Sequence, residues 1–354
     1  MKLPNINIAF STQAQTAISR SQKGVVAIIL KDANANGEHV FTSPIQIPSE
    51  LGTANRDYIA RAFTGYVNPP QKVIAYVIPG DAEDLSEGLS YFETQVFDYL
   101  VGPLDITAAE SGAVAAWIKA QRLLGHTPKA VLPNLSSDSE AVINFVAGGI
   151  KVGTQAYTTA EYCSRIAGIV AGTPMTISCT YAPLPEVTDI ARLSREAMDT
   201  AVGQGKFILF HDGEKVKVGR AVNSLVTTTE SKGEAFKKIK IVEAVDMIQK
   251  DIRATAQDNY IGKYANSYDN KCLLISAIKG YFTGLENDGV LERGTSTVGI
   301  DLDAQEAYLI SRGVDTSGMS EQEIKATPTA DQVFLKATVS ILDAIEDINL
   351  NITI

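Results

Sequence analysis

The sequence predicts an α/β protein, α+β overall, with a strand arm at each end. From about residue 85, helical patterns alternate with short apolar strands, which is typical of a parallel sheet covered by helices on both faces. At both chain ends, apolar and polar residues alternate with a period of two, as in strands with one apolar face. We expect five segments: an arm and linker at 1–23, a small β-rich domain at 24–84, an α/β domain at 85–210, an α+β domain at 211–345 and a strand arm at 346–354.

The first 84 residues suggest an arm followed by strands. In "NINIAF", Ile6, Ile8 and Phe10 alternate with polar residues, and the polar run "STQAQTAISRSQK" then suggests a linker. The stretches "GVVAIILKD" and "PQKVIAYVIPG" are typical of buried strands, and "ANANGEHVF" contains an Asn-Gly hairpin turn. These patterns favour a small, mostly β domain.

The middle of the chain carries helix caps. Ser137 and Glu140 have the spacing of a capping box ahead of "AVINFVAGG", which predicts a helix there. Thr158 and Glu161 have the same spacing ahead of a helix that ends near Gly172. We expect a further helix over "VTDIARLSREAMDTAVGQG", followed by the strand "KFILFH".

The C-terminal third begins with a hairpin whose turn is Asp212-Gly213. Two long helices with apolar faces follow, and Ser320 with Glu323 predicts the start of a shorter one. After a strand over 333–341, the chain ends in "DAIEDINLNITI". Termini are usually polar and frayed unless something holds them, so we expect the two terminal strands to be tied into a partner element. The apolar face of the final strand consists of Ile348, Leu350, Ile352 and Ile354.

Composition excludes several classes of protein. The formal net charge is −10, whereas nucleic-acid binders are more often basic, so we expect no direct nucleic-acid partner. No apolar run approaches the ~20 residues of a membrane span, so we expect no direct membrane contact. The opening "MKLPNINIAF" lacks the apolar core of a signal peptide, which predicts synthesis in the cytoplasm. The 3 cysteines form no CxxC pair and suggest buried reduced thiols.

Motifs for catalysis or cofactor binding are missing from the sequence. There is no P-loop, no dinucleotide-binding glycine motif and no His or Cys pair at metal-ligand spacing. Ser296, in "GTST", has no histidine with a local signature beside it, as nucleophilic serine catalysis would need. Glu346 and Asp347 are neighbours in an expected strand, so they should point to opposite faces and form a solvated edge. We therefore expect no catalytic, cofactor-binding or metal-binding residues.

Several stretches together resemble the contractile tail sheath family of myophages and phage-tail-like bacteriocins, in its Gram-positive prophage type. They are "QKGVVAIIL", "GRAVNSLVTTT" with the two helices after it, and the ending "VFLKATVSILDAIEDINLNITI". The resemblance covers almost the whole chain. It implies a middle domain with a subtilisin-like α/β fold without a catalytic triad, and chain ends that link neighbouring subunits.

The resemblance also implies partners and a function. The expected function is a non-enzymatic subunit that polymerises around an inner tube in an extended, metastable state and contracts to drive the tube through a cell envelope. The expected partners are other copies of the chain, the tail tube protein, and baseplate and tail-terminator proteins, within a particle released by lysis. The alternatives are a hydrolase built on the α/β domain and a non-contractile filament or shell protein.

A basic stretch suggests where such a tube would bind. Between Lys206 and Lys240 the chain has eight Lys and Arg against four Asp and Glu, although the whole chain is acidic. We expect Lys237, Lys238 and Lys240, its densest part, to face the tube. The alternative is an ordinary solvated surface, since most charge clusters are no more than that.

Overall fold

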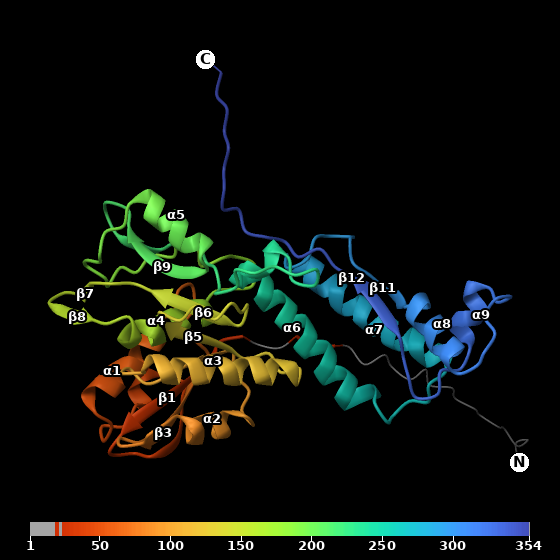
Figure 1. The fold of residues 1–354 in the computed structure, drawn as a ribbon, viewed down its shortest axis with the longest axis horizontal. Coiled ribbons are helices and arrows are strands. Elements are labelled where there is room, and N and C mark those ends of the chain that lie inside the picture. Colours follow the sequence, from red (N-terminus) through yellow and green to blue (C-terminus); the bar gives the residue numbers. More distant parts are fainter. Residues whose placement is uncertain (1–17, 21–22, 354) are drawn as a thin grey trace, which may run out of the picture. The chain divides into compact units, whose positions relative to one another are not determined.

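The structure, a computed structural model, describes residues 18–20 and 23–353, and these form two compact units. Among the described residues, we call 23–250 and 343–353 the sheet unit, and 18–20 and 251–342 the helical unit. Each unit has its own architecture (Figure 1). Among the described helices, none is both long enough and apolar enough to cross a lipid bilayer.

One eight-stranded sheet forms the centre of the sheet unit, with the strand order β10-β9-β6-β5-β4-β1-β3-β2. The six inner strands are parallel, and β2 and β10 run antiparallel at the two edges. The strands are β1 (Val25–Asp32), β2 (Gly37–Phe41), β3 (Lys72–Pro79), β4 (Tyr99–Val101), β5 (Lys129–Pro133), β6 (Val142–Val146), β9 (Lys206–His211) and β10 (Val216–Val218).

Helices cover both faces of this sheet, as alternating helices and parallel strands require. Helices α1 (Thr53–Ala62) and α4 (Cys163–Ala171) pack on one face, and α2 (Ser86–Phe92) and α3 (Ala108–Leu123) on the other (Figure 1). Alternate residues of β1 divide between the two cores: Val26, Ile28 and Leu30 face α1 and α4, and Val25, Ala27 and Ile29 face α2 and α3. The remaining elements of this unit are the pair β7 (Ile150–Val152) and β8 (Gln155–Tyr157), helix α5 (Arg195–Gly203), and 3-10 turns at Pro44–Gln46, Ala160–Tyr162 and Glu234–Lys237.

The helical unit is built on α7 (Tyr268–Asn287). Strand β11 (Thr297–Ile300) packs against this helix and pairs antiparallel with β12 (Leu335–Thr338). Two shorter helices, α8 (Leu302–Ser311) and α9 (Glu321–Ala326), lie between β11 and β12 in the sequence. Helix α6 (Ile239–Thr255) begins in the sheet unit and ends in the helical unit, where a π-helical turn at Ala256–Tyr260 follows it.

The α/β class and several local predictions are confirmed. Ser320 and Glu323 form a reciprocal capping box at α9, and Thr158 with Glu161 makes the same pair of bonds ahead of α4. The Asp212-Gly213 turn joins β9 to β10, which pair antiparallel. The helix predicted over 187–205 is shorter, because it starts only at the Ser194 cap of α5.

Two predictions were wrong because non-local pairing decides them. Residues 24–84 do not stand apart as a β-rich domain: β1 lies between β3 and β4 in the large sheet, and α1 covers it. The helix predicted after Ser137 and Glu140 is strand β6, which is buried between β5 and β9. The Ser137 hydroxyl hydrogen-bonds the Ser224 hydroxyl at 2.9 Å instead of capping a helix.

Candidate subunit-linking site

Strands β11 and β12 form a two-stranded antiparallel sheet in the helical unit. Its antiparallel register runs from Thr297 opposite Thr338 to Ile300 opposite Leu335. No third strand from the described residues pairs with either outer edge. Two strands alone are marginally stable in water, and free strand edges accept a further strand through backbone hydrogen bonds. The β11–β12 sheet is therefore a candidate acceptor, at one of its free edges, for the strand arm of another chain.

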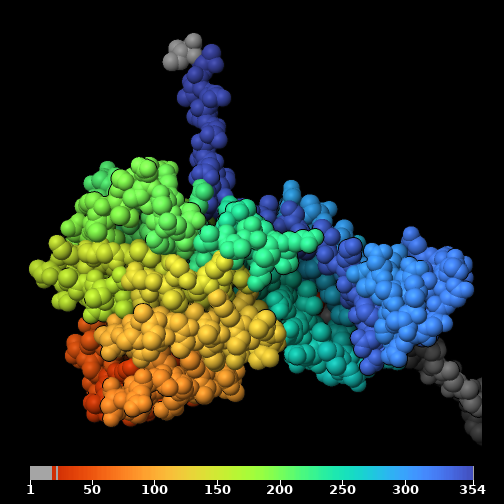
Figure 2. Space-filling model, in the orientation of Figure 1, coloured from red at the N-terminus to blue at the C-terminus, as the bar shows by residue number. Residues whose placement is uncertain are grey.

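The end of the chain is a candidate donor for such an edge. Ile348, Leu350 and Ile352 expose 81%, 75% and 76% of their surface, an unusual state for three large aliphatic residues in succession along one face. Figure 2 shows this last stretch, in dark blue, projecting from the surface of the sheet unit without packing against it. Within the described part of the chain these residues pair with no strand. The other residues predicted for the arms, Ile6, Ile8, Phe10 and Ile354, lie outside the described residues.

The root of this arm is bonded to the sheet unit. The predicted solvated edge is wrong for Glu346, whose side chain is buried, whereas the side chain of Asp347 is 79% exposed. The side chain of Glu346 is only 7% exposed and forms an ion pair with Arg220, whose Nη2 also donates to Asp347 Oδ2 at 2.5 Å. The two neighbouring carboxylates reach one guanidinium because the chain here does not form a regular strand. Asp347 is the last of the described residues that forms an ion pair with the sheet unit, and the arm continues from Ile348.

The three lysines predicted to face a tube have different surroundings. Lys237 is half-buried and pairs with Glu234 one turn earlier, at 2.8 Å. Lys238 forms an ion pair with Asp343, just ahead of the arm root. Lys240 is buried, with 6% of its surface exposed, and burial lowers the pKa of its ammonium group. The prediction of a three-lysine surface is therefore wrong for Lys240, which the first turn of α6 points into the protein.

A buried network of charges on α6 escaped the sequence analysis. Asp246 accepts two hydrogen bonds from the Arg122 guanidinium, at 2.8 and 3.0 Å, and a third from Lys129 Nζ at 3.2 Å. One turn earlier, Glu243 pairs with Lys23 and accepts a hydrogen bond from Tyr99. Burial, together with the Glu243 carboxylate, raises the pKa of Tyr99 well above its ordinary value, so its hydroxyl stays a donor. The network fixes α6 to β4, β5 and α3.

Ser296 and two of the histidines make local structural contacts. Ser296 donates its backbone N–H to Glu286 Oε1 at 3.2 Å, and its hydroxyl has no hydrogen bond to a histidine among the described residues. His39 bonds the Ala35 carbonyl and His211 accepts from the Gly213 N–H. In the described ranges, no group of three His, Cys, Asp or Glu residues could hold a metal ion.

Comparisons with known proteins identify the family. The family model of the phage tail sheath protein central domain matches residues 80–224, and that of the phage tail sheath C-terminal domain matches residues 231–354. A tail sheath protein of Clostridium phage phiCD119 is 39% identical over 358 residues, which cover 99% of this chain and 99% of that protein. The chain belongs to the phage tail sheath family.

Solved structures share the fold of this tail sheath chain. The sheath of the anti-feeding prophage in its contracted state matches with a TM-score of 0.74 at 15% identity, covering 100% of this chain and 99% of that one. A sheath tail protein of Desulfitobacterium hafniense matches with a TM-score of 0.70 at 17% identity, covering 84% of this chain and 94% of that one. This sheath chain is thus a structural subunit, as its resemblance to the family implied.

Proposed function

We propose that this sheath chain polymerises as stacked rings around an inner tail tube and that the polymer contracts to drive the tube into a target cell envelope. The observation that carries the proposal is the exposed apolar face of the C-terminal arm, which pairs with no strand among the described residues. The β11–β12 edge of a neighbouring copy offers the backbone groups that this arm lacks. Such a contact is head-to-tail, so it propagates into rings and helices instead of closing as a dimer.

The stored energy in this proposal lies in contacts between folded bodies. Two lattice packings of different free energy, an extended metastable one and a contracted one, provide the switch. The arms keep neighbours connected while the bodies move. Baseplate and tail-terminator proteins would cap the two ends of the polymer. We further propose that the chain is made in the bacterial cytoplasm and leaves the cell by lysis as part of a particle.

Electron microscopy of particles purified from the producing cell tests the proposal. We expect two helical lattices of this chain, one long and narrow around a tube and one shorter and wider without it. A single lattice spacing under all conditions, including brief acid or urea treatment, would favour the alternative of a non-contractile filament. The hydrolase alternative has no support in the contacts of Ser296 or of the histidines described above, and we propose that the chain is not an enzyme.

For the tube contact, the proposal now rests on Lys237, because Lys238 holds the arm root and Lys240 is buried. Exposed ion pairs contribute only about 0–1 kcal/mol each and are screened by salt, which suits a contact that must release after firing. Lys237→Glu should therefore give sheaths that assemble in the contracted form without a tube, whereas Lys237→Arg should behave like the wild type. Normal extended particles from Lys237→Glu would place the tube contact elsewhere.

A further inference from the structure

Ion pairs hold the C-terminal segment to the sheet unit between Asp343 and Asp347, although Ile345 between them is 88% exposed. Asp343, Glu346 and Asp347 all form ion pairs with the sheet unit. From Ile348 onward, every described residue is exposed and forms no regular structure. Two cationic side chains, Lys238 and Arg220, thus hold residues 343–347, which indicates a built attachment point.

Glu346 is the most buried of these acidic groups. Its Oε1 accepts hydrogen bonds from the hydroxyls of Thr180, at 2.5 Å, and Ser178, at 3.2 Å. Its Oε2 lies 3.3 Å from Arg220 Nε. Removing a carboxylate from water is costly unless hydrogen bonds and an opposite charge compensate for it, and here both are present.

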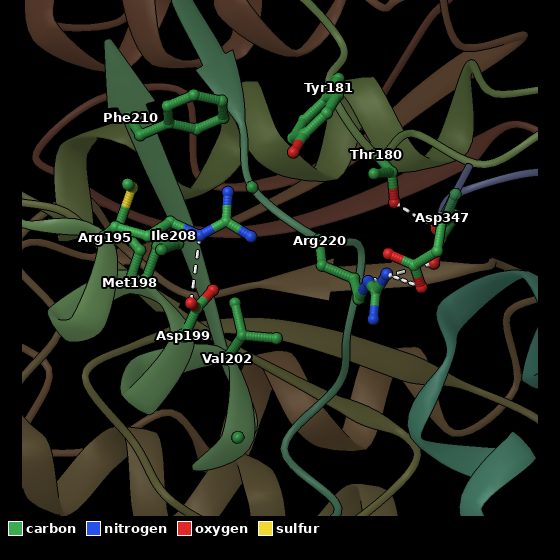
Figure 3. Close-up of a pocket in the computed structure, with 13 residues that line it drawn as sticks. Thr180, Tyr181, Arg195, Met198, Asp199, Val202, Ile208, Phe210, Arg220 and Asp347 are labelled. Atoms are coloured by element: carbon green, nitrogen blue, oxygen red, sulfur yellow. Dashed lines mark hydrogen bonds and ion pairs between the residues drawn. The ribbon is translucent and has the colours of Figure 1, made fainter. Parts of the chain in front are cut away.

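Arg220 and Thr180 connect this carboxylate to the body of the unit. Figure 3 shows Arg220 pointing toward Asp347. Both residues line a cavity of about 340 Å³, which residues of α5 and β9 also line. The Thr180 hydroxyl, besides donating to Glu346, accepts a hydrogen bond from the Ala221 N–H at 3.0 Å. Arg220 belongs to the loop that follows β10, and the hydrogen bond from Ala221 connects Thr180 to the same loop.

A second attachment lies three residues earlier. The Lys238 ammonium binds the Asp343 carboxylate, and Lys238 itself directly precedes α6. Burial alone would raise the pKa of Asp343, but Lys238 and the Ala344 N–H more than offset this, so the pKa lies below its ordinary value. The segment 343–347 is thus held at both ends.

We propose that Lys238, Arg220 and Thr180 are positioning residues that clamp the root of the C-terminal arm and fix the point at which the arm leaves the body. The inference rests on the proposed function, in which the arm joins a neighbouring copy. A fixed exit raises the effective concentration of the arm at the neighbour's sheet edge and lowers the entropy lost on pairing. The two attachments also transmit any force on the arm to the sheet unit, one through Lys238 at the start of α6 and the other through Arg220 in the loop after β10.

The first test uses the unassembled chain and a glutamate-specific endoprotease, which cuts after Glu346 only when the clamp opens. Exposed Glu321 serves as the internal reference site. Lys238→Glu and Asp343→Lys should each speed cleavage at Glu346 about tenfold, equivalent to ~1.4 kcal/mol of local stability. The charge-swapped pair Lys238→Glu with Asp343→Lys should return the rate to that of the wild type. Lys215→Glu, the same charge reversal in the exposed β9–β10 turn, is the matched control.

The second test measures assembly. Lys238→Glu should raise the protein concentration needed for polymerisation about tenfold, and the swapped pair should lower it again. Unchanged cleavage at Glu346 in both single variants would overturn the clamp, and faster cleavage with normal assembly would overturn its positioning role. A wild-type chain that never polymerises would instead refute the proposed function, while the cleavage result still decides on the clamp.

Discussion

Deleting residues 348–354 should leave a folded chain that no longer polymerises at concentrations where the wild type does. Burying a large aliphatic side chain contributes roughly 1.5–3 kcal/mol, so the three described apolar residues of the arm together contribute at least ~4 kcal/mol to each contact. This corresponds to an affinity about a thousandfold weaker without the arm. The deletion starts after Asp347, because Glu346 and Asp347 bind Arg220 and their loss would also disturb the body. Sedimentation and electron microscopy measure the result.

The alternation along the arm provides the control for this deletion. Ile348→Ser, Leu350→Ser and Ile352→Ser combined should reproduce the loss of assembly, because they remove the apolar face only. Asn349→Ser with Asn351→Ser changes the opposite face and should assemble normally. Sheaths of normal length from the deletion or from the triple variant would show that the arm does not link subunits.

Features that depend on neighbours in the sequence could be predicted without a structure. The capping box at Ser320 and the turn at Asp212-Gly213 were predicted because in each case the interacting atoms lie within a few residues of one another. The period of two at the chain end is also local, but residues 348–353 form no strand and are exposed on both faces, so the strand arm stays a prediction.

Features that depend on distant pairing could not be predicted. The capping-box pattern at Ser137 is local, but the ladder that makes β6 a strand comes from β5 and β9, the latter about 60 residues later. Similarly, nothing near Glu346 indicates that Arg220, more than a hundred residues earlier, will cover it. Lys237 and Lys238 look equivalent in the sequence, yet one pairs within its own turn and the other with Asp343.

The buried charges on α6 lead to the largest expected change in stability. Asp246 is 4% exposed, and its two cationic partners, Arg122 and Lys129, are 17% and 8% exposed. Removing one member of a buried ion pair costs roughly 3–5 kcal/mol, because the remaining charges stay buried without compensation. Asp246→Asn keeps the shape of the side chain but leaves two cations facing a neutral amide. We expect the sheet unit to melt about 10 °C lower, given a shift of roughly 2–4 °C per kcal/mol for a unit of this size.

The matched control is Asp199→Asn, the same chemical change in the exposed pair of Asp199 with Arg195, which should leave the melting temperature unchanged. Differential scanning calorimetry separates the two cases, since it also reports whether the two units melt together. Arg122→Met combined with Lys129→Met and Asp246→Leu should recover part of the loss, because these three charges are then gone and Glu140, the other buried partner of Arg122, keeps Lys232. An Asp246→Asn chain that melts with the wild type would show that water or rearrangement satisfies these cations, and that the Asp246 carboxylate does not hold α6 to the sheet.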